Sequence, residues 1–303
     1  MNQQFLTELK AVTAENRIFT DEPMKKHTTF RVGGPADILV QPKGTELAAV
    51  IRLCRKYDVP YQVIGNGSNL LVGDRGIRGL VIEMLSKEDE ICVEDDCITV
   101  GAGMLLSKTA NRAAEHGLTG MEFAAGIPGR IGGAVVMNAG AYGGEMKDIL
   151  TAVTVLDQEG NEKILSAEEL ELGYRTSCIL KKGYIVTGAK IKLKHGEETA
   201  IRARMEELKK QRVEKQPLEY PSAGSTFKRP EGYFAGKLIS DAGLKGFTCG
   251  GACVSEKHAG FVVNKGNATA ADVIKLTDEV SEKIYELNGV KLELEVKKLG
   301  FEE

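Results

Sequence analysis

Two glycine-rich segments carry the residue types that hold phosphate groups. The first, GNGSN at residues 65–69, comes directly after an apolar run. Small residues let backbone N–H groups approach a pyrophosphate, and serine and asparagine side chains add further donors. Asn-Gly is also the commonest signal of a short β-hairpin. Taken alone, the segment therefore fits a plain β-turn better than a phosphate site.

The second segment, residues 124–145, contains seven glycines and shows no clear helical or strand period. A mobile surface loop would have a similar glycine content. Ile127, Ile131 and Val135 are too apolar for a solvated loop, however. A segment that is both glycine-rich and apolar is typical of a wall around a flat, half-apolar ligand.

The spacing of the glycines excludes the two commonest nucleotide-binding motifs. GNGSNLL lacks the third glycine of a dinucleotide-binding fingerprint, and so does the pair Gly101 and Gly103. Residues 107–109 resemble the end of a P-loop, but Ser107 stands where that motif requires glycine. Spacing alone therefore leaves the ligand unnamed.

The six cysteines show no metal-binding or disulfide pattern. None forms a CxxC pair, and no histidine cluster lies beside them. We therefore expect reduced, mostly buried thiols in a cytoplasmic protein. Cys249 and Cys253 are spaced to share a turn, but a zinc site needs two further ligands that the sequence does not place. We expect no metal.

The composition is that of a folded protein of two or three domains. The chain has 303 residues, of which 42% are hydrophobic and 27% charged. A net charge of −3 and the lack of a long basic run argue against nucleic-acid binding. The N-terminus does not read as a signal peptide, and no apolar stretch approaches the roughly 18 residues of a membrane span. The 35 glycines exceed the usual share of about 7% and indicate backbone held close to a ligand.

Hydrophobic patterns place the first glycine segment in a small sheet. Residues 27–42 are expected to form strand, turn and strand around a Gly-Gly-Pro turn. A helix follows from Thr45, with apolar residues at helical spacing. Strands are expected at residues 61–65, 70–72 and 80–84.

The second glycine segment lies in a second block of elements. Residues 97–103 predict a strand and 105–117 a helix. Residues 151–165 predict a hairpin, and 184–194 a long alternating strand. Ser166 and Glu169 have the capping-box spacing that starts a short helix.

A charged helix over residues 198–213 leads to a domain boundary, because Pro217 and Pro221 prevent its continuation. Thr269 and Asp272 cap a later helix, which ends at Gly289. Residues 291–299 alternate like a strand, with Leu292, Leu294 and Val296 on one face and Glu293, Glu295 and Lys297 on the other.

Eight segments match one known family in order along the whole chain. They are TTFRVGGPAD (28–37), GNGSNLL (65–71), GIPGRIGGAVVMNAGAYG (126–143), GYRTS (173–177), KQP (215–217), SAGSTFKRP (222–230), YFAGKLI (233–239) and LELEVKKLG (292–300). Each is weak by itself, but together they are highly specific. By these segments the sequence resembles the UDP-N-acetylenolpyruvoylglucosamine reductase family. The short distance from Arg175 to Ser225 resembles the branch without the long tyrosine-bearing substrate loop.

The resemblance implies an α+β protein with a two-subdomain FAD-binding module of the vanillyl-alcohol-oxidase/PCMH type and a C-terminal α+β substrate-binding domain. We place the FAD-binding subdomains at residues 1–84 and 85–213 and the substrate-binding domain at 214–303, with the last strand returning towards the FAD module. The resemblance also implies that the first glycine segment holds the pyrophosphate of non-covalent FAD and that the second lines the flavin. The implied cofactor residues are Gly65, Asn66, Gly67, Ser68, Asn69, Gly126, Ile127, Pro128, Gly129, Gly132, Gly133, Asn138 and Gly140.

The family's reaction passes a hydride from NADPH through FAD to the enolpyruvyl group of a UDP-amino-sugar, in the synthesis of peptidoglycan precursors. Negative charge then accumulates on the substrate's carboxylate, so the site needs hydrogen-bond donors worth on the order of 3–4 kcal/mol each. By the match, Arg175 and Glu295 serve this charge and Ser225 donates the proton. A bare carboxylate would repel the charge, so Glu295 helps only if protonated or through water or Arg175.

Without the match, ordinary structural roles would suit these three residues. Arg175 would be a surface ion-pair partner and Ser225 a turn residue. Glu295 would lie on a solvated strand face, and Glu293 would be an equal candidate. Only the motif distinguishes them.

Three further residues are implied to bind substrate: Tyr142, Lys215 and Arg229. Arg229 departs from the family, since other members carry asparagine there, yet arginine suits a diphosphate. His258 is expected to be structural.

Two other functions stay open. Another non-covalent FAD-dependent oxidoreductase of a hydroxy acid or sugar would share the fold. No histidine lies between His27 and His116, which argues against a covalent flavin. A non-catalytic nucleotide-binding protein would not need the three catalytic residues together. We expect a cytoplasmic monomer or weak homo-oligomer that binds substrate and NADPH and neither nucleic acid nor membrane.

Overall fold

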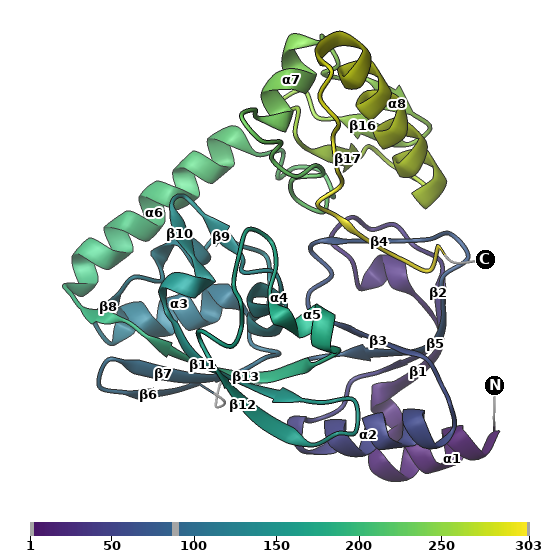
Figure 1. The fold of residues 1–303 in the computed structure, drawn as a ribbon, viewed down its shortest axis with the longest axis vertical. Helices are drawn as coiled ribbons and strands as arrows, with labels where there is room; N and C mark the ends of the chain where they lie inside the picture. Colours follow the sequence, from purple (N-terminus) through teal and green to yellow (C-terminus); the bar gives the residue numbers. More distant parts are fainter. Residues whose placement is uncertain (1–2, 87–90, 302–303) are drawn as a thin grey trace. The chain divides into compact units, whose positions relative to one another are not determined.

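The chain folds into two units, each built from three separate stretches of sequence. The computed structural model describes residues 3–86 and 91–301 (Figure 1). Unit 1 comprises Met1–Phe19, Ile38–Asn66 and Gly79–Arg212, and unit 2 comprises Thr20–Asp37, Gly67–Arg78 and Val213–Glu303. The predicted boundaries at residues 84 and 213 stay a prediction.

A four-stranded sheet has the order β1-β2-β5-β3. Its strands are β1 (Ile18–Pro23), β2 (Pro35–Val40), β3 (Tyr61–Ile64) and β5 (Ile77–Glu83), and its helices are α1 (Gln3–Val12) and α2 (Gly44–Lys56). The predicted apolar face of α2, including Leu47 and Ile51, is buried with Ile82 of β5 in one core. Burial of this face stabilises α2, because a short helix is marginal by itself.

A second sheet in unit 1 is antiparallel, with the order β12-β11-β13-β7-β6. Its strands are β6 (Ile91–Glu94), β7 (Cys97–Gly101), β11 (Leu150–Leu156), β12 (Glu162–Ser166) and β13 (Ile185–Lys192). Helices α3 (Leu106–Glu115), α4 (Ile131–Val136) and α5 (Cys178–Lys182) share a core with this sheet (Figure 1). The predicted hairpin over residues 151–165 is confirmed.

Short elements complete unit 1. They are the 3-10 helices η1 (Glu15–Arg17), η4 (Glu122–Ala124) and η5 (Met146–Asp148), and the strands β8 (Leu118–Thr119), β9 (Gly140–Ala141), β10 (Gly144–Glu145) and β14 (Lys194–His195). Strand β9 pairs with β10 and β8 with β14. The charged helix α6 (Glu198–Lys215) follows β14 and confirms the predicted helix.

Unit 2 packs two helices on a small sheet. Its elements are η2 (Met24–Lys26), β4 (Leu70–Val72), α7 (Ala235–Asp241), β15 (Thr248–Cys249), β16 (Ala252–Val254), β17 (Val262–Asn264), α8 (Ala270–Asn288) and β18 (Lys297–Leu299). Helix α8 starts with the predicted capping box, in which Thr269 and Asp272 exchange side-chain to backbone bonds. It ends at Gly289, whose φ of +66° suits glycine. Strand β18 lies parallel to β4.

Two predicted elements are wrong. Residues 27–34 form no strand, because Arg31 has a φ of +55° and Thr28 Oγ1 bonds the Val32 carbonyl at 3.1 Å in a loop. Ser166 and Glu169 do exchange capping bonds of 2.8 and 3.3 Å, but they close a turn and start no helix.

The predicted strand over residues 291–299 is regular only in β18. Before it, Leu294 forms an isolated bridge with Phe227. The face opposite Leu294 and Val296 is not solvated throughout, since Glu295 is buried as well.

Candidate active site

The first glycine segment is a loop with unused backbone donors. Strand β3 pairs with β5 and β4 pairs with β18, so GNGSN does not close a hairpin between β3 and β4. Gly67 has a φ of +60°, and a Cβ there would collide with the carbonyl oxygen of His27. Within the described ranges, the backbone N–H groups of residues 66–68 donate to no protein acceptor. Successive N–H groups in this state suit an anionic ligand.

The start of the first glycine segment, Gly65 and Asn66, meets the second segment within unit 1. The Asn66 side-chain amide donates to the Pro128 carbonyl at 2.8 Å. The Arg130 side chain packs on Gly65, where an added Cβ would lie 3.4 Å from the Arg130 Cβ. The structure therefore brings together segments that are about 60 residues apart, as a ligand held by both requires.

Part of the second segment is the helix α4, which the apparent lack of period did not predict. Backbone N–H groups of Ile131 and Gly132 donate to the carbonyls of Met104 and Ala102, at 2.9 and 2.8 Å. The apolar residues Ile131 and Val135 are buried in the core of unit 1. Gly133 lies on the opposite, exposed flank, where an added Cβ would meet no atom within 4 Å. This flank leaves space for a flat ligand.

Asn138 fixes the chain that follows α4. Its side chain is buried, and its amide donates to Glu145 Oε2 at 2.9 Å and to the Gly173 carbonyl at 3.1 Å. Its Oδ1 accepts the Lys147 N–H at 2.9 Å. Both amide hydrogens are therefore used inside the protein, so the Asn138 side chain has no amide hydrogen left to donate to a ligand.

Tyr142 and Arg175 lie at the same small hairpin of unit 1. Tyr142 occupies the turn between β9 and β10, with a φ of +52°. Arg175 also has a positive φ, +55°, and its Nη2 lies 3.5 Å from the Gly140 carbonyl. Its guanidinium lies 5.3 Å from the centre of the Tyr174 ring. The structure thus brings two residues predicted to bind substrate to one turn.

Arg212 was missed at the level of the sequence. Its side chain packs against Gly126, where an added Cβ would lie 3.3 Å from the Arg212 Cδ. Burial lowers the pKa of Arg212, and the interaction with Tyr142 partly opposes this. Arg212 lies three residues before the KQP segment, in a helix with many charged residues. This position was the only signal in the sequence that could have singled out Arg212 as a site residue.

Ser225 and Glu295 lie close together in unit 2. The Glu295 N–H donates to the Thr226 carbonyl at 2.8 Å, so the segments of the two residues run side by side. Asn69 joins them, because its amide donates to the Glu295 carbonyl at 3.3 Å and its own carbonyl accepts the Lys297 N–H at 2.9 Å. Three predicted residues from distant parts of the sequence thus share one place.

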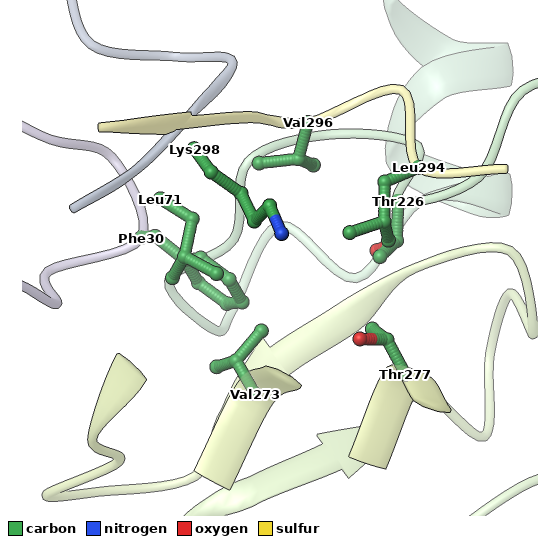
Figure 2. A pocket seen from close by; sticks show the side chains of 8 residues that line it. All are labelled: Phe30, Leu71, Thr226, Val273, Thr277, Leu294, Val296 and Lys298. Carbon is green, nitrogen blue, oxygen red and sulfur yellow. The ribbon is translucent and has the colours of Figure 1, made fainter. Parts of the chain in front are cut away.

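The residues on either side of Glu295 in the sequence, Leu294 and Val296, line a small apolar pocket. Figure 2 shows the side chains of Leu294, Val296 and Thr226 around a small apolar pocket, together with Phe30 and others. Because both neighbours of Glu295 line this pocket, the alternation of an extended chain turns Glu295 away from it.

Exposure separates the two candidate glutamates. Glu295 is 8% exposed, whereas Glu293 is exposed and pairs with Lys228 Nζ at 2.9 Å. Lys228 lowers the pKa of Glu293. Ser225 itself is exposed, as a group that meets a substrate must be.

The two predicted phosphate contacts are exposed cations. Lys215 is the last residue of α6. The Arg229 guanidinium lies 4.0 Å from the centre of the Phe234 ring, in the geometry of a cation–π contact. Their roles stay predictions.

In residues 3–86 and 91–301, no three His, Cys, Asp or Glu side chains are grouped to hold a metal ion. Over the same ranges, no helix combines the length and apolar character that a membrane span needs. All six cysteines are unbridged, and three of them are buried.

Comparisons with known proteins cover nearly the whole chain. Residues 36–166 match the family described as FAD binding domain, and residues 216–299 match the C-terminal domain of UDP-N-acetylenolpyruvoylglucosamine reductase. Proteins named UDP-N-acetylenolpyruvoylglucosamine reductase from Agathobacter rectalis and Clostridium perfringens are 54% and 53% identical, over 99% of both chains in each case. The crystal structure of the reductase from Thermus caldophilus aligns with a TM-score of 0.79 and 42% identity, covering 91% of this chain and 97% of that one.

Proposed function

Because the chain belongs to the UDP-N-acetylenolpyruvoylglucosamine reductase family, we propose that it reduces UDP-N-acetylglucosamine enolpyruvate to UDP-N-acetylmuramate for peptidoglycan synthesis. The observation that carries this conclusion is the 54% identity over 99% of both chains. The FAD binding domain and the reductase C-terminal domain both match. The predicted family and α+β fold class are thereby confirmed.

The residues of the two glycine segments fit an FAD molecule. FAD, when bound, supplies the redox chemistry, since it accepts a hydride from NADPH and passes it to the enolpyruvyl double bond. The N–H groups of residues 66–68 are available to the pyrophosphate. The open flank of α4 at Gly133 leaves space for the flat ring. Residues 65–69 and 126–140 would hold the cofactor.

The proposed catalytic residues act on charge and on a proton. Arg175 offers the substrate's carboxylate a bidentate fork, which stabilises the negative charge that accumulates there during hydride addition. Ser225 holds a proton on Oγ and donates it to the neighbouring carbon, so that hydride and proton together saturate the double bond. Glu295, whose backbone N–H donates to the Thr226 carbonyl, assists if it is protonated or acts through water or Arg175.

Exposed cations and one tyrosine complete the proposed substrate site. Lys215 and Arg229 suit the phosphates of the substrate and of NADPH. Tyr142 stands at the turn that the Arg175 side chain also reaches, which favours a shared ligand.

Replacement of Ser225 by alanine tests the mechanism. Under anaerobic conditions, NADPH should bleach the flavin of Ser225→Ala as fast as that of the wild type. Recovery of the colour on addition of substrate should slow by about 10²- to 10⁴-fold, because the proton donor is lost. Both rates are measured by stopped-flow absorbance.

Ser222→Ala, in the same loop, is the matched control and should show normal recovery. Fast recovery in Ser225→Ala would remove Ser225 from the mechanism. A purified protein that is colourless and cannot be reconstituted with FAD would overturn the whole proposal.

We also propose that the enzyme works in the cytoplasm, as a monomer or weak homo-oligomer. Six unbridged cysteines support a reducing compartment. The domain boundaries at residues 84 and 213, and membership of the branch without the long tyrosine-bearing loop, stay predictions.

A further inference from the structure

Arg130 is a half-buried cation between the two glycine segments. Its side-chain stem packs on Gly65, and its Nη1 donates to the Gly103 carbonyl at 2.6 Å. Its Nε is fully buried and, within the described residues, has no hydrogen-bond partner. A buried donor without a partner is costly, and orphaned donors are rare in folded proteins.

The protein neutralises this cation incompletely. Burial lowers the pKa of Arg130, and the attraction of Glu83 does not offset the loss of solvation. The Glu83 carboxylate is itself buried and accepts a bond from Gln41 Nε2 at 2.6 Å. A half-buried guanidinium that donates to a carbonyl, and whose pKa stays lowered despite the attraction of Glu83, is a group that an added anion would stabilise.

The position of Arg130 indicates which anion this is. The stem lies on Gly65, the first residue of the loop whose N–H groups lack acceptors. Two residues before Arg130, the Pro128 carbonyl holds the Asn66 side chain. A ligand that contacts both segments through phosphate groups would therefore come close to the guanidinium.

We propose that Arg130 binds the diphosphate of FAD and thereby selects the dinucleotide over unphosphorylated flavin. Guanidinium donors match phosphate oxygens in charge and geometry. The inference rests on the proposed function, because it takes FAD as the cofactor. The simplest rival is that Arg130 only ties Gly103 to the first loop.

Flavin titrations of the apoprotein separate these two roles. Binding of FAD and of riboflavin, which lacks phosphate, is followed by quenching of flavin fluorescence. In Arg130→Met the Kd for FAD should rise by about 10-fold to 100-fold, the usual effect of losing a hydrogen bond to a charged group. The Kd for riboflavin should change by less than about 3-fold, because no phosphate contact is lost.

Arg52→Met is the matched control. Arg52 also lies in unit 1 and donates to a glycine carbonyl, that of Gly160 at 2.9 Å. Its FAD affinity should equal that of the wild type. Thermal unfolding of each apoprotein checks that the variants are folded.

Two results would overturn the inference. One is an unchanged Kd for FAD in Arg130→Met, and the other is an equal weakening of FAD and riboflavin, which would show a structural role. If Arg130→Met does not fold, Arg130→Lys is used instead, because lysine keeps the charge and lacks the planar guanidinium donors. The ratio of the Kd for FAD to the Kd for riboflavin then decides between the two roles. Failure of the wild-type apoprotein to bind FAD would instead contradict the proposed function.

Discussion

Three of the residues expected to meet the ligands have a strained backbone. Asn138, Tyr142 and Arg175 have φ values of 43°, 52° and 55°. A left-handed conformation costs a residue other than glycine about 1–2 kcal/mol, so it persists only where the surroundings determine it. Here Asn138 provides that restraint, since its side chain bonds both the hairpin at Glu145 and the Gly173 carbonyl beside Arg175. Such strain is common at functional sites.

His258 is another residue whose environment leads to a measurable effect. Its Nδ1 accepts the Gly260 N–H at 3.1 Å and its ring packs edge-on against Phe261. Burial lowers the pKa of His258 below its ordinary value of 6.5. The unfolded chain therefore binds a proton more readily than the folded one, and the free energy of unfolding should fall as the pH drops below about 6.5.

Replacement of His258 by asparagine should remove the pH dependence that His258 gives to the free energy of unfolding, because asparagine can accept the same N–H without titrating. The loss of Tm between about pH 7.5 and 5.5 should be smaller in His258→Asn than in the wild type. His116→Asn, at an exposed position, should behave like the wild type. An identical loss of Tm in His258→Asn and wild type would contradict the assignment.

At the scale of elements, the second glycine segment shows how one helix can serve both core and ligand. Helix α4 buries Ile131 and Val135 and leaves Gly133 open on its other side. Glycine inside a helix costs about 0.5–1 kcal/mol relative to alanine. The backbone at Gly133 does not require glycine, because its φ is not positive and an added Cβ would meet no atom within 4 Å. A ligand that requires this space would account for glycine here.

Gly133→Ala should therefore change two properties in opposite directions. The apoprotein should gain about 0.5–1 kcal/mol in free energy of unfolding, because the helix is favoured. FAD affinity should fall by about 10-fold, since the added methyl group occupies the cofactor's space. Denaturant unfolding and flavin fluorescence measure the two effects.

Gly44→Ala provides the control, because Gly44 begins α2 and also has open space around it. It should leave FAD affinity unchanged. A Gly133→Ala protein that is stabilised and keeps full FAD affinity would show that the flank of α4 faces no cofactor.

At the scale of the whole molecule, unit 2 depends on segments from the first quarter of the chain. Phe30, Val32 and Leu71 belong to its core. Asp74 accepts the N–H groups of Ala270 and Ala271, at 2.8 and 3.0 Å, and so caps α8. The predicted substrate-binding domain, residues 214–303, lacks the three core residues and Asp74.

Residues 214–303 expressed alone should therefore lack a cooperative fold. Loss of Phe30 and Leu71 alone costs about 5–10 kcal/mol, at about 3–5 kcal/mol for the phenylalanine and 2–5 for the leucine. This cost is comparable with the 5–15 kcal/mol that stabilises a typical domain in all. Circular dichroism during heating and the dispersion of amide proton shifts would report the result. A fragment that unfolds cooperatively near the Tm of the full chain would contradict this expectation.

Local patterns predicted much of the secondary structure and some of the site. The helices α2, α6 and α8 and the hairpin of β11 and β12 follow from periodicity and capping residues, which act within a few positions. The loop at residues 27–34 was missed because its conformation depends on bonds such as Thr29 N–H to the Gly67 carbonyl. Arg130 and Arg212 were missed because their burial depends on packing against glycines far away in sequence.

The sequence by itself determined the two glycine segments, the capped helices and, through its ordered motifs, the family. Only the tertiary structure showed that Glu295 is buried and Glu293 is exposed, because burial depends on which face the surrounding chain covers. It also decided that GNGSN is no hairpin, since β4 pairs with β18 from the far end of the chain. Such pairings are fixed by the packing of the whole fold, which no local pattern contains.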